Sequence, residues 1–304
     1  MILYASPRFA EHATPPGHPE RPERAEVFDA VAAEFARQGG SIRPPRAATR
    51  EELARVHTAA YLDRIAATAG RAAMLDPDTF TSPESHEIAL LAAGAAIDAA
   101  REARQTGTPT LALVRPPGHH AEAERAMGFC LYNNIAVAAM ALRAEGAARV
   151  AIVDIDVHHG NGTQAIFYTD PTVLFVSSHQ FPFYPGTGAA NETGAGPGEG
   201  YTLNVPMPAG SGDTDFEAAY GTTIIPAVER FHPDVLLVSA GFDAHELDPL
   251  GGLRLTTSGY TGLLARLDDV ASRVCGRRIA LVTEGGYHLT ALRECLESAI
   301  RVLD

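Results

Sequence analysis

Residues 149–164 read RVAIVDIDVHHGNGTQ, an apolar run that ends in acidic and imidazole side chains. With the two-residue period of a β-strand, Asp154, Asp156 and His158 face one side, while the valine and isoleucine residues between them face the other. Neighbouring carboxylates in an apolar sheet are costly unless a cation or firm hydrogen bonds compensate them. The stretch therefore predicts a buried strand that carries a metal site at its carboxyl end. We prefer this interpretation to one capping aspartate and one structural histidine.

Short apolar runs of the same kind recur along the chain and alternate with alanine-rich stretches of helical period. The runs that read as buried strands are Thr110–Val114, Val150–Val153, Val173–Val176, Val235–Ser239 and Ile279–Thr283. The stretches that read as helices are Ser85–Gln105, Asn134–Glu145, Asp215–Arg230 and Ser258–Val274. This alternation predicts an α/β fold with a central, mainly parallel sheet flanked by helices. Ligands bind such sheets at the carboxyl ends of the strands, so polar residues just past each run are the candidate site.

Composition excludes several classes of function. The chain has 304 residues, 46% of them hydrophobic, with 24 basic residues against 37 acidic ones and a net charge of −13. All the basic residues are arginine, which excludes a lysine Schiff base and a phosphate-binding loop that needs lysine. The acidic balance argues against direct nucleic-acid binding and suits a cationic substrate.

Cysteine usage and hydropathy point to a reduced compartment. Cys130, Cys275 and Cys295 are too few and too scattered for a disulfide framework or a cysteine-built zinc site. No apolar run approaches the ~18 residues of a membrane span, and the N-terminus does not read as a signal peptide. We expect a cytoplasmic protein with no membrane partner.

A third metal ligand is expected from another strand end, because an open zinc site usually takes three protein ligands. Residues 235–248 read VLLVSAGFDAHELD, an apolar strand followed by small residues and then Asp243. Asp243 is therefore the predicted partner of Asp156 and His158. Asp248 precedes a proline, where a turn or cap role is expected.

Two further strand ends carry candidate catalytic groups. In residues 111–130, LALVRPPGHHAEAERAMGFC, two prolines and a glycine hold His119 and His120 in a rigid loop. One or both are candidates for general base or acid, with Asp154 as an orienting partner. In residues 281–288, LVTEGGYH, the paired glycines permit a sharp turn that presents Tyr287, whose hydroxyl is a candidate oxyanion donor.

Together, RPPGHHAEAERAMGFC, DIDVHHGNG, SAGFDAHELDP and EGGYH resemble the motifs of the zinc-dependent histone deacetylase family, and its class II and bacterial deacetylase-like members most of all. The resemblance runs from HPERPER at residues 18–24 through Tyr287. It implies one domain over residues 1–304 with the three-layer arginase/deacetylase-type fold. It also implies hydrolysis of N-acyl amides of lysine or related amines.

Carried over position by position, the resemblance makes Asp156, His158 and Asp243 the ligands of one catalytic Zn²⁺, in agreement with the strand argument. It implies that His120 is the general base and that His119, paired with Asp154, has an electrostatic or proton-donating role. Tyr287 matches the tyrosine that polarises the amide carbonyl. The residues expected along the acyl-lysine tunnel and its rim are Gly128, Phe129, Tyr184 and His18.

The family also binds structural K⁺ or Na⁺. One such site maps onto the region of Asp154, Asp156, His158, Ser177 and Ser178, and a second onto Phe167, Asp170, Val173 and Tyr201.

The sequence departs from the class I pattern at Asn161, where class I members have an aspartate that orients the second histidine. A neutral amide stabilises an imidazolium less than a carboxylate does. We therefore expect His120 to stay neutral near pH 7, as a general base must.

Alternatives remain at the level of the substrate. An acetylpolyamine amidohydrolase is the main rival, since relatives selective for polyamines carry an acidic gatekeeper where this chain has Leu250. Leu250 favours an acetylated lysine peptide or protein, although nearby Glu246 can partly replace the gatekeeper. A two-manganese ureohydrolase lacks its extra aspartates here, and a silent acyl-lysine-binding module fits poorly because no catalytic group is missing. The choice of zinc or iron and any homo-oligomeric state stay open.

Overall fold

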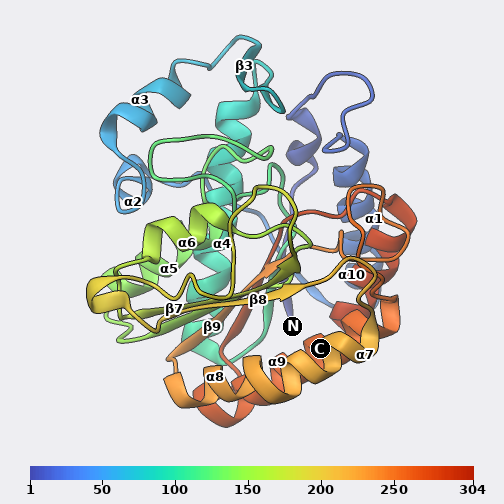
Figure 1. The fold of residues 1–304 in the computed structure, drawn as a ribbon. Coiled ribbons are helices and arrows are strands. Elements are labelled where there is room, and N and C mark those ends of the chain that lie inside the picture. The colour runs from blue at the N-terminus through green and yellow to red at the C-terminus, as the bar shows by residue number, and fades with distance from the viewer.

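Eight strands form one parallel sheet in the computed structural model, which describes all residues 1–304 (Figure 1). The strand order across the sheet is β2-β1-β5-β10-β9-β6-β7-β8, and every pairing is parallel. The strands are β1 (Ile2–Tyr4), β2 (Ser41–Arg43), β5 (Thr110–Ala112), β6 (Val150–Asp154), β7 (Val173–Gln180), β8 (Thr202–Met207), β9 (Val235–Ala240) and β10 (Ile279–Thr283). The prediction of a parallel α/β sheet is confirmed.

Helices cover both faces of the sheet, as the alternating sequence pattern predicts. One face packs against α1 (Glu23–Arg37), α7 (Asp213–Ala219), α8 (Ile225–Phe231), α9 (Thr257–Cys275) and α10 (Leu289–Leu303). The other packs against α2 (Arg50–Leu53), α3 (Ala59–Ala66), α4 (Ser85–Thr106), α5 (Asn134–Ala144) and α6 (Asn161–Phe167). Each face has its own apolar core of 42 buried residues, and neighbouring residues of a strand alternate between the two cores. No helix has the length and apolarity needed to cross a lipid bilayer.

Local chemistry explains where the helices begin and end. Thr256 caps α9 by accepting the amide of Gly259, and Gly276 ends it with a left-handed φ of +60°. The helix expected at Asp215–Arg230 is instead divided, because a π-helical turn at Tyr220–Ile224 separates α7 from α8. Pro226 lies in the first turn of α8 and has no amide proton to donate to the preceding turn, which accounts for the widened helix.

Several elements lie outside the predicted runs, among them β8 and the helices α1, α2, α3, α6 and α10. The edge strands β1 and β2 have only three residues each, too few to give a recognisable run. A small antiparallel hairpin of β3 (Ala73–Asp76) and β4 (Thr79–Thr81) is separate from the main sheet. Short 3-10 turns occur at Pro7–Glu11 and Gly196–Gly198.

Candidate active site

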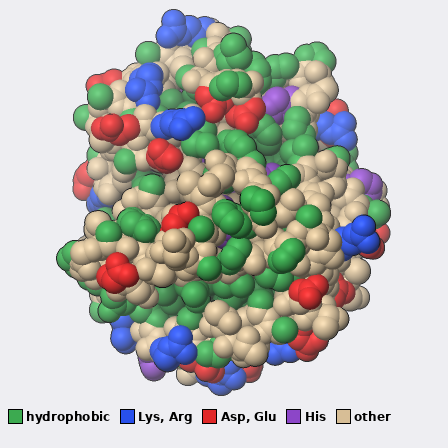
Figure 2. Space-filling model, in the orientation of Figure 1, with side chains coloured by type: hydrophobic (Ala, Val, Ile, Leu, Met, Phe, Trp, Pro, Cys, Tyr) green, Lys and Arg blue, Asp and Glu red, His purple; other side chains and the backbone are tan.

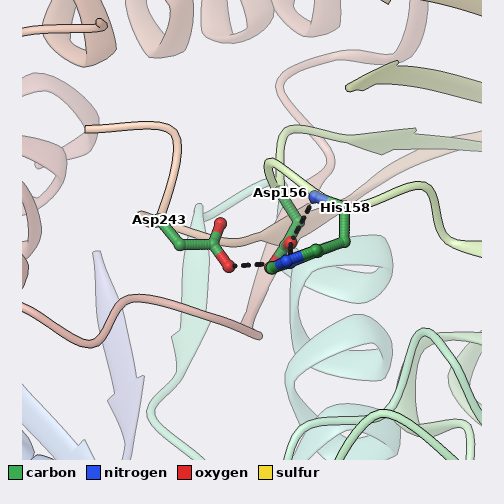
Figure 3. Close-up of side chains that lie close together, drawn as sticks. All are labelled: Asp156, His158 and Asp243. Atoms are coloured by element: carbon green, nitrogen blue, oxygen red, sulfur yellow. Dashed lines mark hydrogen bonds and ion pairs between the residues drawn. The ribbon is translucent and has the colours of Figure 1, made fainter. Parts of the chain in front are cut away.

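The three predicted metal ligands meet at the carboxyl ends of two neighbouring strands. Asp154 ends β6 opposite Ser239 of β9, so the chain that follows each strand leaves the sheet side by side. Asp156 and His158 follow β6, Asp243 follows β9, and ligand atoms of these three residues lie within 4.8 Å of one another (Figure 3). The Nδ1 atom of His158 lies 3.1 Å from Oδ1 of Asp156 and 3.3 Å from Oδ2 of Asp243.

Hydrogen bonds hold the two carboxylates but leave one oxygen without a donor. Asp156 accepts the amides of His158 and Gly285, each at 2.9 Å, and Asp243 Oδ1 accepts the amide of Val157 at 2.9 Å. Asp243 Oδ2 is buried and accepts no hydrogen bond. A buried acceptor normally has a hydrogen-bond partner. This oxygen instead faces a second carboxylate and an imidazole, so its lone pairs are free to bind a cation. Two carboxylates and one imidazole form a donor set that suits an open zinc site.

Glycines leave the space that these carboxylates occupy. A Cβ on Gly285 would lie 2.0 Å from Oδ2 of Asp243, and one on Gly241 would lie 2.1 Å from Oδ2 of Asp156. Neither position tolerates a side chain while the carboxylates stay in place. Gly241 of the SAGFD motif and Gly285 of the EGGYH motif are therefore needed because only a glycine leaves room for the two carboxylates.

The charges of the cluster also fit a divalent cation. Burial and the charge of Asp156 raise the pKa of Asp243 to about 7. Burial opposes protonation of His158, yet Asp156 and Asp243 together raise its pKa to about 10. The raised pKa of His158 reflects the two carboxylates beside it, whose negative charge a bound divalent cation would neutralise.

The tandem histidines lie beside this cluster, and their partners differ. His119 Nδ1 is 2.9 Å from Oδ2 of Asp154, and His119 Nε2 is 3.9 Å from Oδ2 of Asp156. Burial alone would lower the pKa of His119, but the charges of Asp154 and Asp156 raise it well above its usual value. Asp154 therefore partners His119, as the sequence predicts, and favours its imidazolium form.

His120 has the opposite environment. Burial, followed by the charges of His119 and His158, lowers its pKa well below the usual value. Its Nδ1 donates to Oδ1 of Asn161 at 2.7 Å, and the amide group of Asn161 donates in turn to Glu122 at 2.9 Å. An amide oxygen only accepts, so the proton of neutral His120 lies on Nδ1 and Nε2 keeps a free lone pair. This is the tautomer that a general base needs.

Tyr287 reaches the site on the loop between β10 and α10. A carboxylate oxygen of Asp248 accepts the amides of Tyr287 at 2.6 Å and His288 at 3.0 Å, so Asp248 caps this loop as expected. The guanidinium of Arg24 lies 5.1 Å from the centre of the Tyr287 ring. Burial, and then the charge of Asp243, raises the pKa of the Tyr287 hydroxyl well above 10, so the hydroxyl keeps its proton.

Aromatic rings lie beside these groups, among them two of the residues expected along an acyl-chain tunnel. Phe129 meets Tyr287 edge-on at 5.8 Å between ring centres, and Tyr184 meets His120 edge-on at 5.2 Å. Gly128 permits the close approach, because a Cβ there would lie 2.3 Å from the His120 ring. Both Gly128 and Phe129 have positive φ angles, of 57° and 69°. Positive φ is uncommon for phenylalanine, so the surrounding structure holds this wall in place.

The rim is built from separate loops. His18 packs edge-on against Phe129 at 4.7 Å, and its Nε2 lies 3.1 Å from the carbonyl oxygen of Asp78 in the β3–β4 hairpin. Leu250 is partly exposed, and its amide donates to the carboxylate of Asp248, which also holds Tyr287. Figure 2 shows a hollow below the segment that carries β3, where apolar, acidic and histidine side chains meet.

The residues expected at the monovalent-cation sites lie on adjoining segments. Asp154 pairs with Ser177 in the register of β6 and β7, and the Ser178 hydroxyl is 3.4 Å from the carbonyl oxygen of Asp154. At the second site, Phe167 and Asp170 share a turn that leads into Val173, the first residue of β7. The carbonyl oxygen of Tyr201 accepts the amide of Phe175 at 2.9 Å. Cation binding at both places stays a prediction.

The roles of several residues of the site could not be predicted from the sequence, although Glu20 and Arg24 lie within the HPERPER stretch. Phe183 stacks on the ring of His158, with ring centres 5.4 Å apart, yet it lies in a loop with no periodic pattern. Arg24 is fully buried and donates to the carbonyl oxygens of Glu284 and Gly286 at 2.5 and 2.8 Å. Glu20 is buried too and pairs with both Arg24 and Arg115. The HPERPER stretch therefore packs behind the Tyr287 loop, and only its buried charges distinguish it from an ordinary polar loop.

Comparisons with known proteins cover almost the whole chain. The sequence model of the histone deacetylase domain family matches residues 18–303 of this chain. Histone deacetylase 10, chloroplastic, of Oryza sativa subsp. japonica is 41% identical, over 99% of this chain and 72% of that protein. The histone deacetylase-like amidohydrolase of Pseudomonas aeruginosa is 43% identical, over 89% of this chain and 73% of that protein.

A solved structure extends the comparison to the fold. The crystal structure of the HDA15 HD domain is similar with a TM-score of 0.95 at 40% identity, over 99% of this chain and 87% of that chain. Histone deacetylase 15 of Arabidopsis thaliana is 43% identical over the whole of this chain, which spans 55% of that protein.

Proposed function

The chain belongs to the histone deacetylase family, and we propose that it is a zinc-dependent amidohydrolase that removes acetyl or other short acyl groups from acylated lysine side chains. The products are a carboxylate and the free amine. The observation that carries the proposal is the unpartnered Oδ2 of Asp243, which faces His158 and Asp156 beside the tandem histidines. Membership of the family supports a hydrolase, and we add to this that the metal is zinc and the substrate an acylated lysine.

Asp156, His158 and Asp243 would hold the metal ion. When bound, a zinc ion supplies Lewis-acid polarisation of the amide carbonyl and of the attacking water. Asp156 and Asp243 are fixed by backbone amides, so the ligands are held in position before the ion binds.

His120 removes the proton from the attacking water. Its Nε2 lone pair is free because the Nδ1 proton is donated to Asn161. Its lowered pKa keeps it neutral at pH 7, so it accepts a proton without first having to lose one.

His119 and Tyr287 complete the reaction. The raised pKa of His119 keeps an imidazolium beside the site, where it supplies the proton that the leaving amine needs. The Tyr287 hydroxyl donates to the oxygen of the former carbonyl as negative charge develops there. Asp154 balances the imidazolium charge of His119 until His119 gives up that proton.

The substrate is assigned from the walls of the tunnel. The aromatic rings of Phe129 and Tyr184 lie beside Tyr287 and His120, where they suit a methylene chain such as that of lysine. Leu250 puts an apolar side chain where a polyamine-selective relative has a carboxylate, which supports an acyl-lysine peptide over an acylated polyamine. Glu246, four residues before Leu250, is exposed and offers a carboxylate to a cationic substrate, so an acylated polyamine is tested as well.

Turnover and metal content test this proposal together. The metal-free protein should not hydrolyse an acetyl-lysine fluorogenic peptide, and one equivalent of zinc should restore hydrolysis. Binding of one zinc ion without turnover of either an acyl-lysine peptide or N8-acetylspermidine would instead favour a catalytically silent module.

A further inference from the structure

Glu284 is a fully buried carboxylate that the mechanism above does not use. It directly follows β10 and precedes the paired glycines of the Tyr287 loop. Its backbone amide donates to the carbonyl oxygen of Ala240 at the end of β9. The residue therefore stands between the strand ends that carry Asp243 and Tyr287.

The side chain of Glu284 reaches the neighbouring loop and binds it through the backbone. Oε2 accepts the amide of Gly118 at 2.6 Å and the amide of His119 at 3.1 Å. Oε1 lies 3.3 Å from the hydroxyl of Ser239, which donates to it. One carboxylate thus joins the tandem-histidine loop to β9 and β10.

Other hydrogen bonds fix neighbouring atoms of the tandem-histidine loop: the carbonyl oxygen of His119 accepts the amide of Thr163 at 3.2 Å, and that of Pro116 accepts the side-chain amide of Asn134 at 3.1 Å. Gly118 lies so close to the start of α5 that a Cβ would be 2.5 Å from the amide nitrogen of Asn134. That contact limits approach from one side, but it does not set the direction of the Gly118 and His119 amides. Buried amides need acceptors, and the Glu284 carboxylate is the one that these two amides have.

We propose that Glu284 is a positioning residue that holds the tandem-histidine loop in register with the metal ligands and Tyr287. The inference rests on the proposed amidohydrolase function and adds a residue to it. The hydrogen bonds of the Glu284 side chain go to Gly118, His119 and Ser239 and to none of the metal ligands, so it acts through the loop that carries the two histidines. A displacement of about 1 Å in a catalytic group can cost roughly 100-fold in rate, which makes such a clamp consequential.

The test compares Glu284→Ala with Glu284→Gln. A glutamine oxygen can accept both amides while its amide group donates to Ser239, so E284Q should keep kcat within about threefold of the natural protein. E284A leaves two buried amides without an acceptor, and its kcat should fall roughly 10- to 100-fold with KM nearly unchanged. If E284A does not fold, Glu284→Asp replaces it, because the shorter side chain cannot reach both amides.

A second measurement does not depend on turnover. Hydrogen exchange at residues 115–120 should accelerate in E284A and stay slow in E284Q. Glu52 supplies the matched control, since it is a buried glutamate that accepts the amide of Thr49 at 2.8 Å in the remote helix α2. Glu52→Ala should lower stability without changing kcat.

Three outcomes would overturn the proposed role of Glu284. The first two are a fall in kcat as large in E284Q as in E284A, and a fall in kcat as large in E52A as in E284A. The third is an E284A protein with the kcat and the hydrogen exchange of the natural protein. Failure of the natural zinc-loaded protein to hydrolyse any acyl-lysine peptide would refute the proposed function instead. In that case the exchange experiment still decides whether Glu284 holds the loop.

Discussion

The floor and the rim of the candidate active site are built in different ways. Asp154, Asp156 and Asp243 on the floor are fully buried, and every polar atom except Asp243 Oδ2 has a fixed partner. The rim is carried by loops, and Tyr184 is 37% exposed there. Strand ends hold the floor, whereas loop contacts between aromatic rings hold the rim. The groups proposed for the chemistry therefore lie at strand ends, and the residues proposed to select the substrate lie on loops.

Substitution of a floor ligand should have the largest effect. Asp243→Asn removes a carboxylate from the metal cluster, and we expect loss of tightly held zinc and a fall in kcat of at least about 1,000-fold, since several kcal/mol of Lewis-acid stabilisation are lost. Metal analysis and turnover of an acetyl-lysine peptide measure both effects. The exposed Asp269→Asn in α9 is the control and should keep zinc and activity. A zinc-loaded, active D243N protein would exclude Asp243 as a ligand.

Loss of the oxyanion donor should come next. Tyr287→Phe should lower kcat by on the order of 100-fold while KM changes little, because the hydroxyl acts in the transition state. Zinc content should stay at one equivalent, which separates this variant from D243N. Natural turnover by Y287F would place the oxyanion donor elsewhere.

A smaller effect is expected in the pH profile of the base. The pKa of His120 is lowered, so the neutral form persists to low pH. Asn161→Asp adds a carboxylate that favours the imidazolium, which raises this pKa and moves the acidic limb of kcat/KM to higher pH. The shift should be about one pH unit, equal to roughly a tenfold loss below the limb. An unmoved profile would show that His120 is not the group that titrates.

The smallest effect is expected at the rim. Leu250→Glu should raise kcat/KM for N8-acetylspermidine relative to an acetyl-lysine peptide by several-fold, about 1 kcal/mol, because an exposed carboxylate attracts a cation only weakly. Zinc content and the pH profile should not change. An L250E protein with the natural substrate ratio would remove Leu250 from the account of specificity.

The same division explains what the sequence predicts. The central strands and the floor are readable because buried strands leave continuous apolar runs and each polar residue of the floor follows one of them. Asp156, His158 and Asp243 come together because β6 and β9 are neighbours in the sheet. The two local motifs that hold these residues carry no information about the order of the strands. The motif resemblance, rather than periodicity, assigned the separate roles of His119 and His120.

Other parts were not readable for physical reasons. Glu284 and Arg24 lie within quoted motifs, but their roles could not be read, because each binds backbone atoms of a distant loop and so has no matching side chain in the sequence. The ring of Phe183 lies against His158 because three-dimensional loop packing brings them together. Pro226 is a sequence signal for an irregularity between α7 and α8, but the π-helical form of the turn depends on packing.

The most direct test of the central claim is kcat/KM of the zinc-loaded protein on an acetyl-lysine peptide and on N8-acetylspermidine, each repeated with Tyr287→Phe. The account predicts faster turnover of the peptide and loss of that turnover in Y287F. Faster turnover of the polyamine would contradict the acyl-lysine assignment and make another acidic residue, with Glu246 the first to substitute, the determinant of specificity. Turnover that survives in Y287F would contradict the proposed mechanism itself.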